Sequence, residues 1–219
     1  MNIIVRQAGA FLALPLFLAC TTLAAAATPE ELIRPIQEQW AEIKYRQPEK
    51  QQAESYRLLA AQAKKIVEAN PKMPEPLIWE GIVVSSEAGA KGGLGALSLA
   101  KEARQLLDEA LKLNDKALNG SAYTSLATLY AKVPGWPVGF GDKERAEEYF
   151  KKALAINPDG IDPNFFYGEY LADRGRTGEA LTYLEKALKA PPRPGREVAD
   201  SGRRQEIQAL LAKVRKEGK

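Results

Sequence analysis

The sequence of 219 residues has no histidine and a single cysteine, Cys20. One cysteine cannot form a disulfide within the chain, and the donor set of a His- or Cys-ligated zinc ion is missing. The absence of histidine also excludes nucleophilic and acid–base sites that use an imidazole. Glycosidase-like chemistry with Asp and Glu alone needs two carboxylates across a cleft, and no pair stands out. We therefore expect a protein that is not an enzyme and that holds no metal and no cofactor.

An excess of one charge is missing as well. Lys and Arg number 31 and Asp and Glu 28, which gives a net charge of +3. Both signs are mixed along every segment but the last, where Arg203, Arg204 and Lys213 are interpreted as the solvated face of a helix. The pattern has no nucleic-acid footprint, so no nucleic-acid partner is expected. Hydrophobic residues make up 45% of the chain, as in an ordinary globular domain.

Long apolar runs are absent apart from one at the N-terminus. This run covers residues 8–19 behind Arg6 and is short for a membrane span. The small residues at 23–27 suit signal peptidase, so the sequence predicts a signal peptide at 1–27 and a mature domain at 28–219. The expected location is the periplasm.

A second interpretation of the N-terminus places the cut before Cys20, as in a bacterial lipoprotein. The new N-terminal cysteine would then carry lipid and tether the domain to a membrane. Membrane attachment is expected only if the chain is lipidated at Cys20.

Two segments near the C-terminus repeat each other at an offset of 34 residues. Each has two small residues with a large one between them, followed by a proline. Small residues let two helices approach closely, the large residue fills the gap, and proline ends the helix. The matched positions are Ala146 and Ala180, Phe150 and Leu184, Ala153 and Ala187, and Pro158 and Pro192.

This pattern resembles the tetratricopeptide repeat, a helix-turn-helix unit of 34 residues. The resemblance is best over 121–158 and 162–192, and it continues less regularly towards the N-terminus. It implies an all-α, right-handed helical solenoid of about four helix pairs, with a C-terminal capping helix at about 197–217. The implied protein is an exported bacterial member of this repeat family.

The first helices of successive repeats line a concave groove in such solenoids. The resemblance implies a groove of mixed apolar and hydroxyl character that binds a protein or peptide partner, such as a component of the envelope or of a transporter. In the other interpretation these residues only pack against neighbouring repeats. The residues concerned are Ile78, Ile82, Ser85, Thr124, Thr128, Phe165, Glu169 and Ala172.

An insertion at 133–142 separates two predicted helices and contains two prolines and three glycines. Its Trp136 and Phe140 have large apolar side chains that a surface loop would leave exposed to water. Either they pack against their own helices or they line a ligand pocket. The insertion also resembles that of the T component of TRAP transporters. This implies an alternative function, an accessory protein that binds a small apolar solute and a solute-binding protein.

A second glycine-rich stretch, Gly89–Gly95, lacks the Gly-Lys-Ser/Thr of a phosphate-binding loop. We interpret it as a flexible linker between two helices.

Overall fold

The computed structural model describes residues 27–218, in which every regular element is helical. Cys20 and nearly all of the predicted signal peptide lie outside this range. No helix of the described part is both long and apolar enough to cross a membrane. The elements are α1 (Pro29–Arg46), α2 (Glu49–Ala69), α3 (Pro74–Lys91), α4 (Gly93–Leu113), a 3₁₀ turn (Ala117–Gly120), α5 (Ser121–Lys132), α6 (Lys143–Ile156), α7 (Ile161–Asp173), α8 (Thr177–Leu188) and α9 (Glu197–Glu217).

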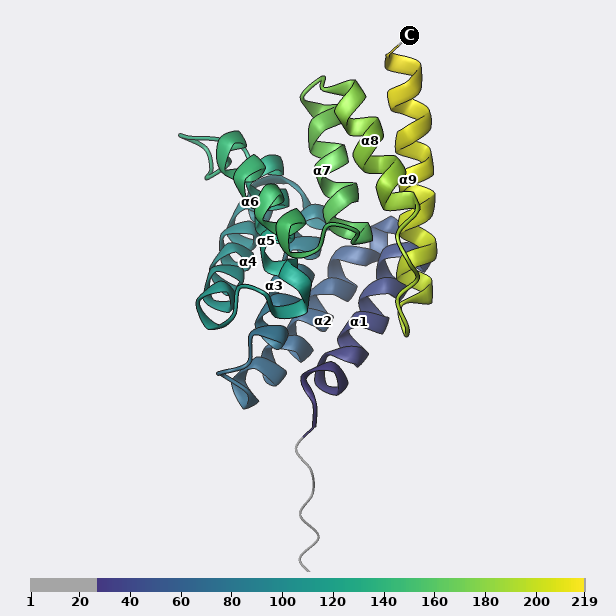
Figure 1. The fold of residues 1–219 in the computed structure, drawn as a ribbon. Helices are drawn as coiled ribbons and strands as arrows, with labels where there is room; N and C mark the ends of the chain where they lie inside the picture. The colour runs from purple at the N-terminus through teal and green to yellow at the C-terminus, as the bar shows by residue number, and fades with distance from the viewer. Residues whose placement is uncertain (1–26, 219) are drawn as a thin grey trace, which may run out of the picture.

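The helices pack as four successive pairs, α1 with α2, α3 with α4, α5 with α6 and α7 with α8. The first helices also contact one another in order, from α1 to α3, α5 and α7. Figure 1 shows these pairs stacked along the chain. The prediction of an all-α helical solenoid is confirmed.

Local signals explain where several helices begin. Thr28 and Glu31 form a capping box at the start of α1, with the Thr28 hydroxyl accepting from the Glu31 amide at 3.2 Å. The Asp142 carboxylate caps α6 by accepting from the Arg145 amide at 3.0 Å. The Gly89–Gly95 stretch is not a linker, because α3 continues to Lys91 and α4 begins at Gly93. The chain turns at Gly92 and Gly93, whose positive φ values favour glycine.

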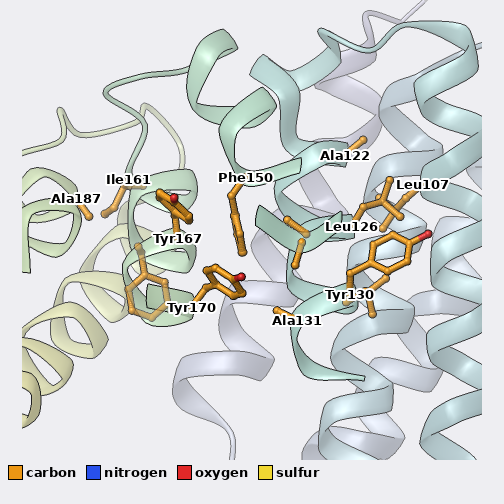
Figure 2. Close-up of a cluster of buried hydrophobic side chains, with 14 of the residues drawn as sticks. Leu107, Ala122, Leu126, Tyr130, Ala131, Phe150, Ile161, Tyr167, Tyr170 and Ala187 are labelled. Atoms are coloured by element: carbon orange, nitrogen blue, oxygen red, sulfur yellow. The ribbon is translucent and has the colours of Figure 1, made fainter. Parts of the chain in front are cut away.

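The pairs are locked by a small residue on the first helix against a large one on the second. A Cβ on Gly81 of α3 would stand 2.8 Å from Leu107 Cγ, and a Cβ on Gly168 of α7 would stand 2.8 Å from Leu184 Cγ. Phe150 of α6 packs against the next pair, 5.5 Å from the rings of Tyr167 and Tyr170 of α7. Figure 2 shows Leu107, Leu126 and Phe150 along this core. Close packing of this kind fixes neighbouring repeats in one register.

The C-terminal helix α9 runs beside α8, and its first turns approach α1 (Figure 1). Its second half is apolar towards the core, with Ile207, Leu211 and Val214 buried. Its first half sits against α1, where Gly202 faces the Tyr45 ring so closely that a Cβ would overlap it. The helix therefore covers the last pair and also closes the solenoid back onto its first helix.

Candidate functional site

The predicted groove residues separate into an open set and a buried set. Ile82, Ser85, Thr128, Glu169 and Ala172 keep intermediate exposure. The buried set is Ile78, Thr124 and Phe165, which are 0%, 6% and 5% exposed. The open set comes from α3, α5 and α7, which lie next to one another. These residues form the inner face, the name used below for the open positions of these three helices.

Two causes explain the buried set. Ile78 and Thr124 belong to first helices that pack directly against each other, α3 and α5. Phe165 is instead covered by α9, since the Arg203 guanidinium lies 4.5 Å from the centres of both the Phe165 and the Phe166 rings. A planar guanidinium over an aromatic face is a favourable contact. The position of Phe165 in the repeat is unchanged, but a helix beyond the repeat occupies the space in front of it.

The polar groups of the inner face have defined partners. The Ser85 hydroxyl donates to the Gly81 carbonyl at 2.7 Å, and the Thr128 hydroxyl donates to the Thr124 carbonyl at 2.9 Å. Each hydroxyl has thereby used its one proton, so its oxygen remains as an acceptor. Serine and threonine on this face can therefore receive a donor from a bound partner.

One end of the inner face is ionic. The Lys132 ammonium lies 3.2 Å from a Glu169 oxygen and 2.9 Å from an Asp173 oxygen. Burial opposes the charged form, but the two carboxylates outweigh it and raise the pKa of Lys132 above its ordinary value. Glu169 is therefore already engaged, and a partner would meet a charged group held in place by its neighbour.

The loop between α5 and α6 places its two aromatic residues in different environments. Phe140 packs 5.5 Å from the Tyr130 ring, with the Arg104 guanidinium 4.5 Å from the centre of its own ring. Trp136 is 90% exposed. One ring therefore covers the helices while the other faces solvent. A solute pocket shared by these rings, as the transporter resemblance implies, would need both to face one space.

A family model described as tetratricopeptide repeat matches residues 139–159, which hold the end of the loop and α6. The chain carries a tetratricopeptide repeat. A crystal structure of a thermophilic tetratricopeptide repeat protein of Thermus thermophilus is similar at 17% identity and a TM-score of 0.47, over 85% of this chain and 98% of that chain. No curated protein matches the chain.

Next to the repeat region lies an ionic cluster that the sequence pattern did not indicate. Asp162 of α7 pairs with Arg193 at 2.7 Å and with Arg203 at 3.0 Å. Burial raises the pKa of Asp162, but the two guanidiniums outweigh it and lower the pKa to about 2. Arg193 also pairs with Asp200 at 2.6 Å. The cluster fastens α9 to the first helix of the last repeat.

The ionic contacts continue from α9 to α1. Glu206 lies 3.3 Å from the Lys44 ammonium and accepts from the Tyr45 hydroxyl at 3.2 Å. Arg203 is 6% exposed, so its interpretation as part of a solvated face was wrong. Arg204 is likewise engaged, because it donates to the carbonyls of Leu188 and Ala190 at 2.7 and 2.8 Å. The one hint in the sequence is Gly202, whose missing side chain lets the helices meet.

Within residues 27–218 no group of three or more His, Cys, Asp or Glu side chains is arranged to hold a metal ion. The inner face presents apolar, hydroxyl and charged groups.

Proposed function

We propose that the protein is an extracytoplasmic scaffold that binds a peptide or protein partner along the inner face. The observation that carries this proposal is the open set itself, formed by Ile82, Ser85, Thr128 and Glu169 on three first helices that pack side by side. Tetratricopeptide repeats are built as interaction scaffolds, and their extended concave surfaces are suited to this use. The export pattern at 8–27 of the sequence supports a location outside the cytoplasm.

The groups on the inner face define what a partner needs. Ile82 offers an apolar contact, and the oxygens of Ser85 and Thr128 offer acceptors for backbone or side-chain N–H groups. Because α9 covers the inner positions next to Phe165, the partner is confined to the part between α3 and the Lys132–Glu169 pair. A short segment with exposed donors fits this surface better than a large apolar ligand.

The test is affinity capture from the native envelope fraction with the whole chain and with a Ser85→Arg/Thr128→Arg variant. Both positions are partly exposed on helices, so we expect the variant to keep its helical melting curve and to lose the captured partner. The matched control is Leu58→Arg/Leu113→Arg, which adds the same charge at exposed positions of the second helices, 51% and 45% exposed. Capture that survives in the inner-face variant, or that disappears equally in the control, would contradict the proposal.

A further inference from the structure

The tip of the loop between α5 and α6 is an exposed apolar feature that the proposed function leaves unused. Residues 134–138 are all exposed, and Trp136 and Val138 are 90% and 65% exposed. No charged residue occurs from 133 to 141. Large apolar side chains exposed together on a protein surface usually mark a contact site. In Figure 1 this segment forms the pointed loop beside α6.

Hydrogen bonds within its own backbone fix the conformation of the loop. The Gly141 amide donates to the Pro134 carbonyl at 2.9 Å, and the Val138 and Gly139 amides donate to the Gly135 carbonyl at 3.2 and 3.1 Å. A Cβ on Gly139 would stand 2.5 Å from the Pro134 carbonyl oxygen, so the turn needs glycine there. Because these contacts fix the turn, insertion of the tip into another medium costs little ordering of the loop.

Cations surround the base of this loop. Arg104 stacks on Phe140, Lys143 donates to the Ala131 carbonyl, and Arg145 donates to the Tyr130 hydroxyl at 3.2 Å. Lys101 lies on the same face of α4 as Arg104, three residues earlier. Among the described residues no ion pair within 4.0 Å involves any of these four cations. The Arg104 Nε is also buried without a hydrogen-bond partner.

Carboxylates also lie near these cations. Asp142 caps α6, Glu144 is exposed in the first turn of that helix, and Asp108 lies one turn further along α4 than Arg104. None of them lies in the segment 133–141. The loop therefore presents an uncharged tip above a base where four cations lie beside three carboxylates, with no ion pair within 4.0 Å between them among the described residues.

We propose that this loop inserts Trp136 and Val138 into the headgroup region of a membrane that contains anionic lipid. An exposed indole is suited to this region because its ring is apolar and its N–H is polar. Lys101, Arg104, Lys143 and Arg145 then face lipid phosphates. A lipid surface fits better than a protein partner because the tip protrudes and the Trp136 N–H is its one side-chain hydrogen-bond donor. Specific recognition by a protein would need more polar side chains than this. This contact is additional to the partner bound on the inner face.

The experiment is a fluorescence titration of the whole chain with vesicles of equimolar phosphatidylglycerol and phosphatidylcholine, with and without bromine on the acyl chains. The other two tryptophans, Trp40 and Trp79, are 8% and 5% exposed. The difference between the wild-type spectrum and that of Trp136→Phe therefore reports the loop. We expect a blue shift and bromine quenching of this difference, both weakened by added salt and by omission of phosphatidylglycerol.

Matched variants separate the loop from the rest of the chain. Val138→Asp should weaken partition to these vesicles about tenfold, since it places a charge in the inserting tip. Leu58→Asp, the same change at an exposed position of α2, should leave partition unchanged. Removing a cation by Lys143→Gln should cost roughly fivefold. The N-terminal apolar run is identical in all variants, so it cannot produce these differences.

Two results would overturn the proposal. The first is a Trp136 difference spectrum that vesicles leave unchanged in a chain with intact helical signal, or equal partition of the two aspartate variants. The second is a protein that shields Trp136 from acrylamide where vesicles do not, which would assign the tip to a protein partner.

Discussion

Two regions of the first helices hold equivalent positions of the repeat, Thr124 of α5 and Phe165 of α7, and bury them against different neighbours. At α7, Phe165 is covered by Arg203 of α9. At α5, Thr124 lies on a helix that packs directly against the neighbouring first helix α3. The repeat pattern alone assigns both residues to a groove. The difference shows that at the end of the stack a helix outside the repeat takes the place of a neighbouring first helix.

The first helices α3 and α7 also differ in the surroundings of an acidic side chain. Asp162 of α7 pairs with the guanidiniums of Arg193 and Arg203, which lower its pKa to about 2. Glu80 of α3 is 5% exposed, and no hydrogen bond or ion pair of its side chain is found among the described residues. Burial and then the neighbouring Glu102 raise the pKa of Glu80 to about 7, against a smaller opposing effect of Lys64. The two shifts are opposite because Asp162 has two guanidinium partners and Glu80 has none among the described residues.

The largest effect is expected from Asp162→Asn, which leaves Arg193 and Arg203 without their shared carboxylate. This leaves Arg193 with Asp200 alone and Arg203 with Glu206 alone in a partly buried cluster, so we expect a loss of about 3 kcal/mol in the free energy of unfolding, measured by urea denaturation. Asp159→Asn is the matched control. Asp159 pairs with Lys186 at 3.2 Å but is 77% exposed, so little change is expected. Equal effects of the two substitutions would show that the cluster does not hold α9.

The same substitution should also change how the stability of the fold depends on pH. Asp162 has a lowered pKa in the folded protein, so its contribution is present above its ordinary pKa of 3.8 and is lost as the pH falls towards 2. Wild-type Tm should therefore fall over this range more steeply than that of Asp162→Asn. Parallel curves would contradict the role of the ion pairs.

A smaller effect is expected where α9 meets α1. Gly202→Ala places a methyl group against the Tyr45 ring, and the local shift should lower Tm by roughly 3–6 °C. Gly178→Ala in α8 is the control, because a Cβ there meets nothing within 4 Å. It should raise Tm slightly through helix propensity. If Gly202→Ala also raises Tm, the α1–α9 contact is looser than described.

The smallest effect concerns Glu80. Its raised pKa means that its ionised form opposes folding above the ordinary value of 4.5, and this cost is fully present above about pH 7. Glu80→Gln should therefore raise Tm at pH 8 by roughly 2–4 °C and leave it nearly unchanged at pH 4. A thermal scan at both pH values checks this. A gain of the same size at pH 4 would show that charge is not the cause.

The sequence predicted the elements that follow from a local period. The small positions Ala146, Ala153, Ala180 and Ala187 and the large Phe150 and Leu184 are all buried at 0% or 1% exposure, as their spacing indicates. These contacts arise between neighbouring helices, so a pattern of 34 residues contains them. The open residues Ile82, Ser85, Thr128 and Glu169 came from the resemblance in the same way, and their role as a binding surface stays a prediction.

The closure by α9 could not be predicted in this way. Arg203 and Asp162 are 41 residues apart, and Tyr45 and Glu206 are 161 apart, and neither spacing belongs to a repeat. The interpretation of Gly89–Gly95 as a flexible linker was wrong for a related reason. The number of glycines indicates a linker, but tertiary packing overrides this local preference. The helices α3 and α4 therefore continue until only a turn at Gly92 and Gly93 separates them. The outward placement of Trp136 depends on the loop backbone and was likewise not determined by composition.

The most direct test of the partner surface is hydrogen–deuterium exchange of the whole chain with and without its captured partner. We expect slower exchange in α3, α5 and the Lys132 end of the inner face, with α2 and α4 unchanged. Protection confined to the second helices, with α3 and α5 unaffected, would contradict a partner bound on the inner face.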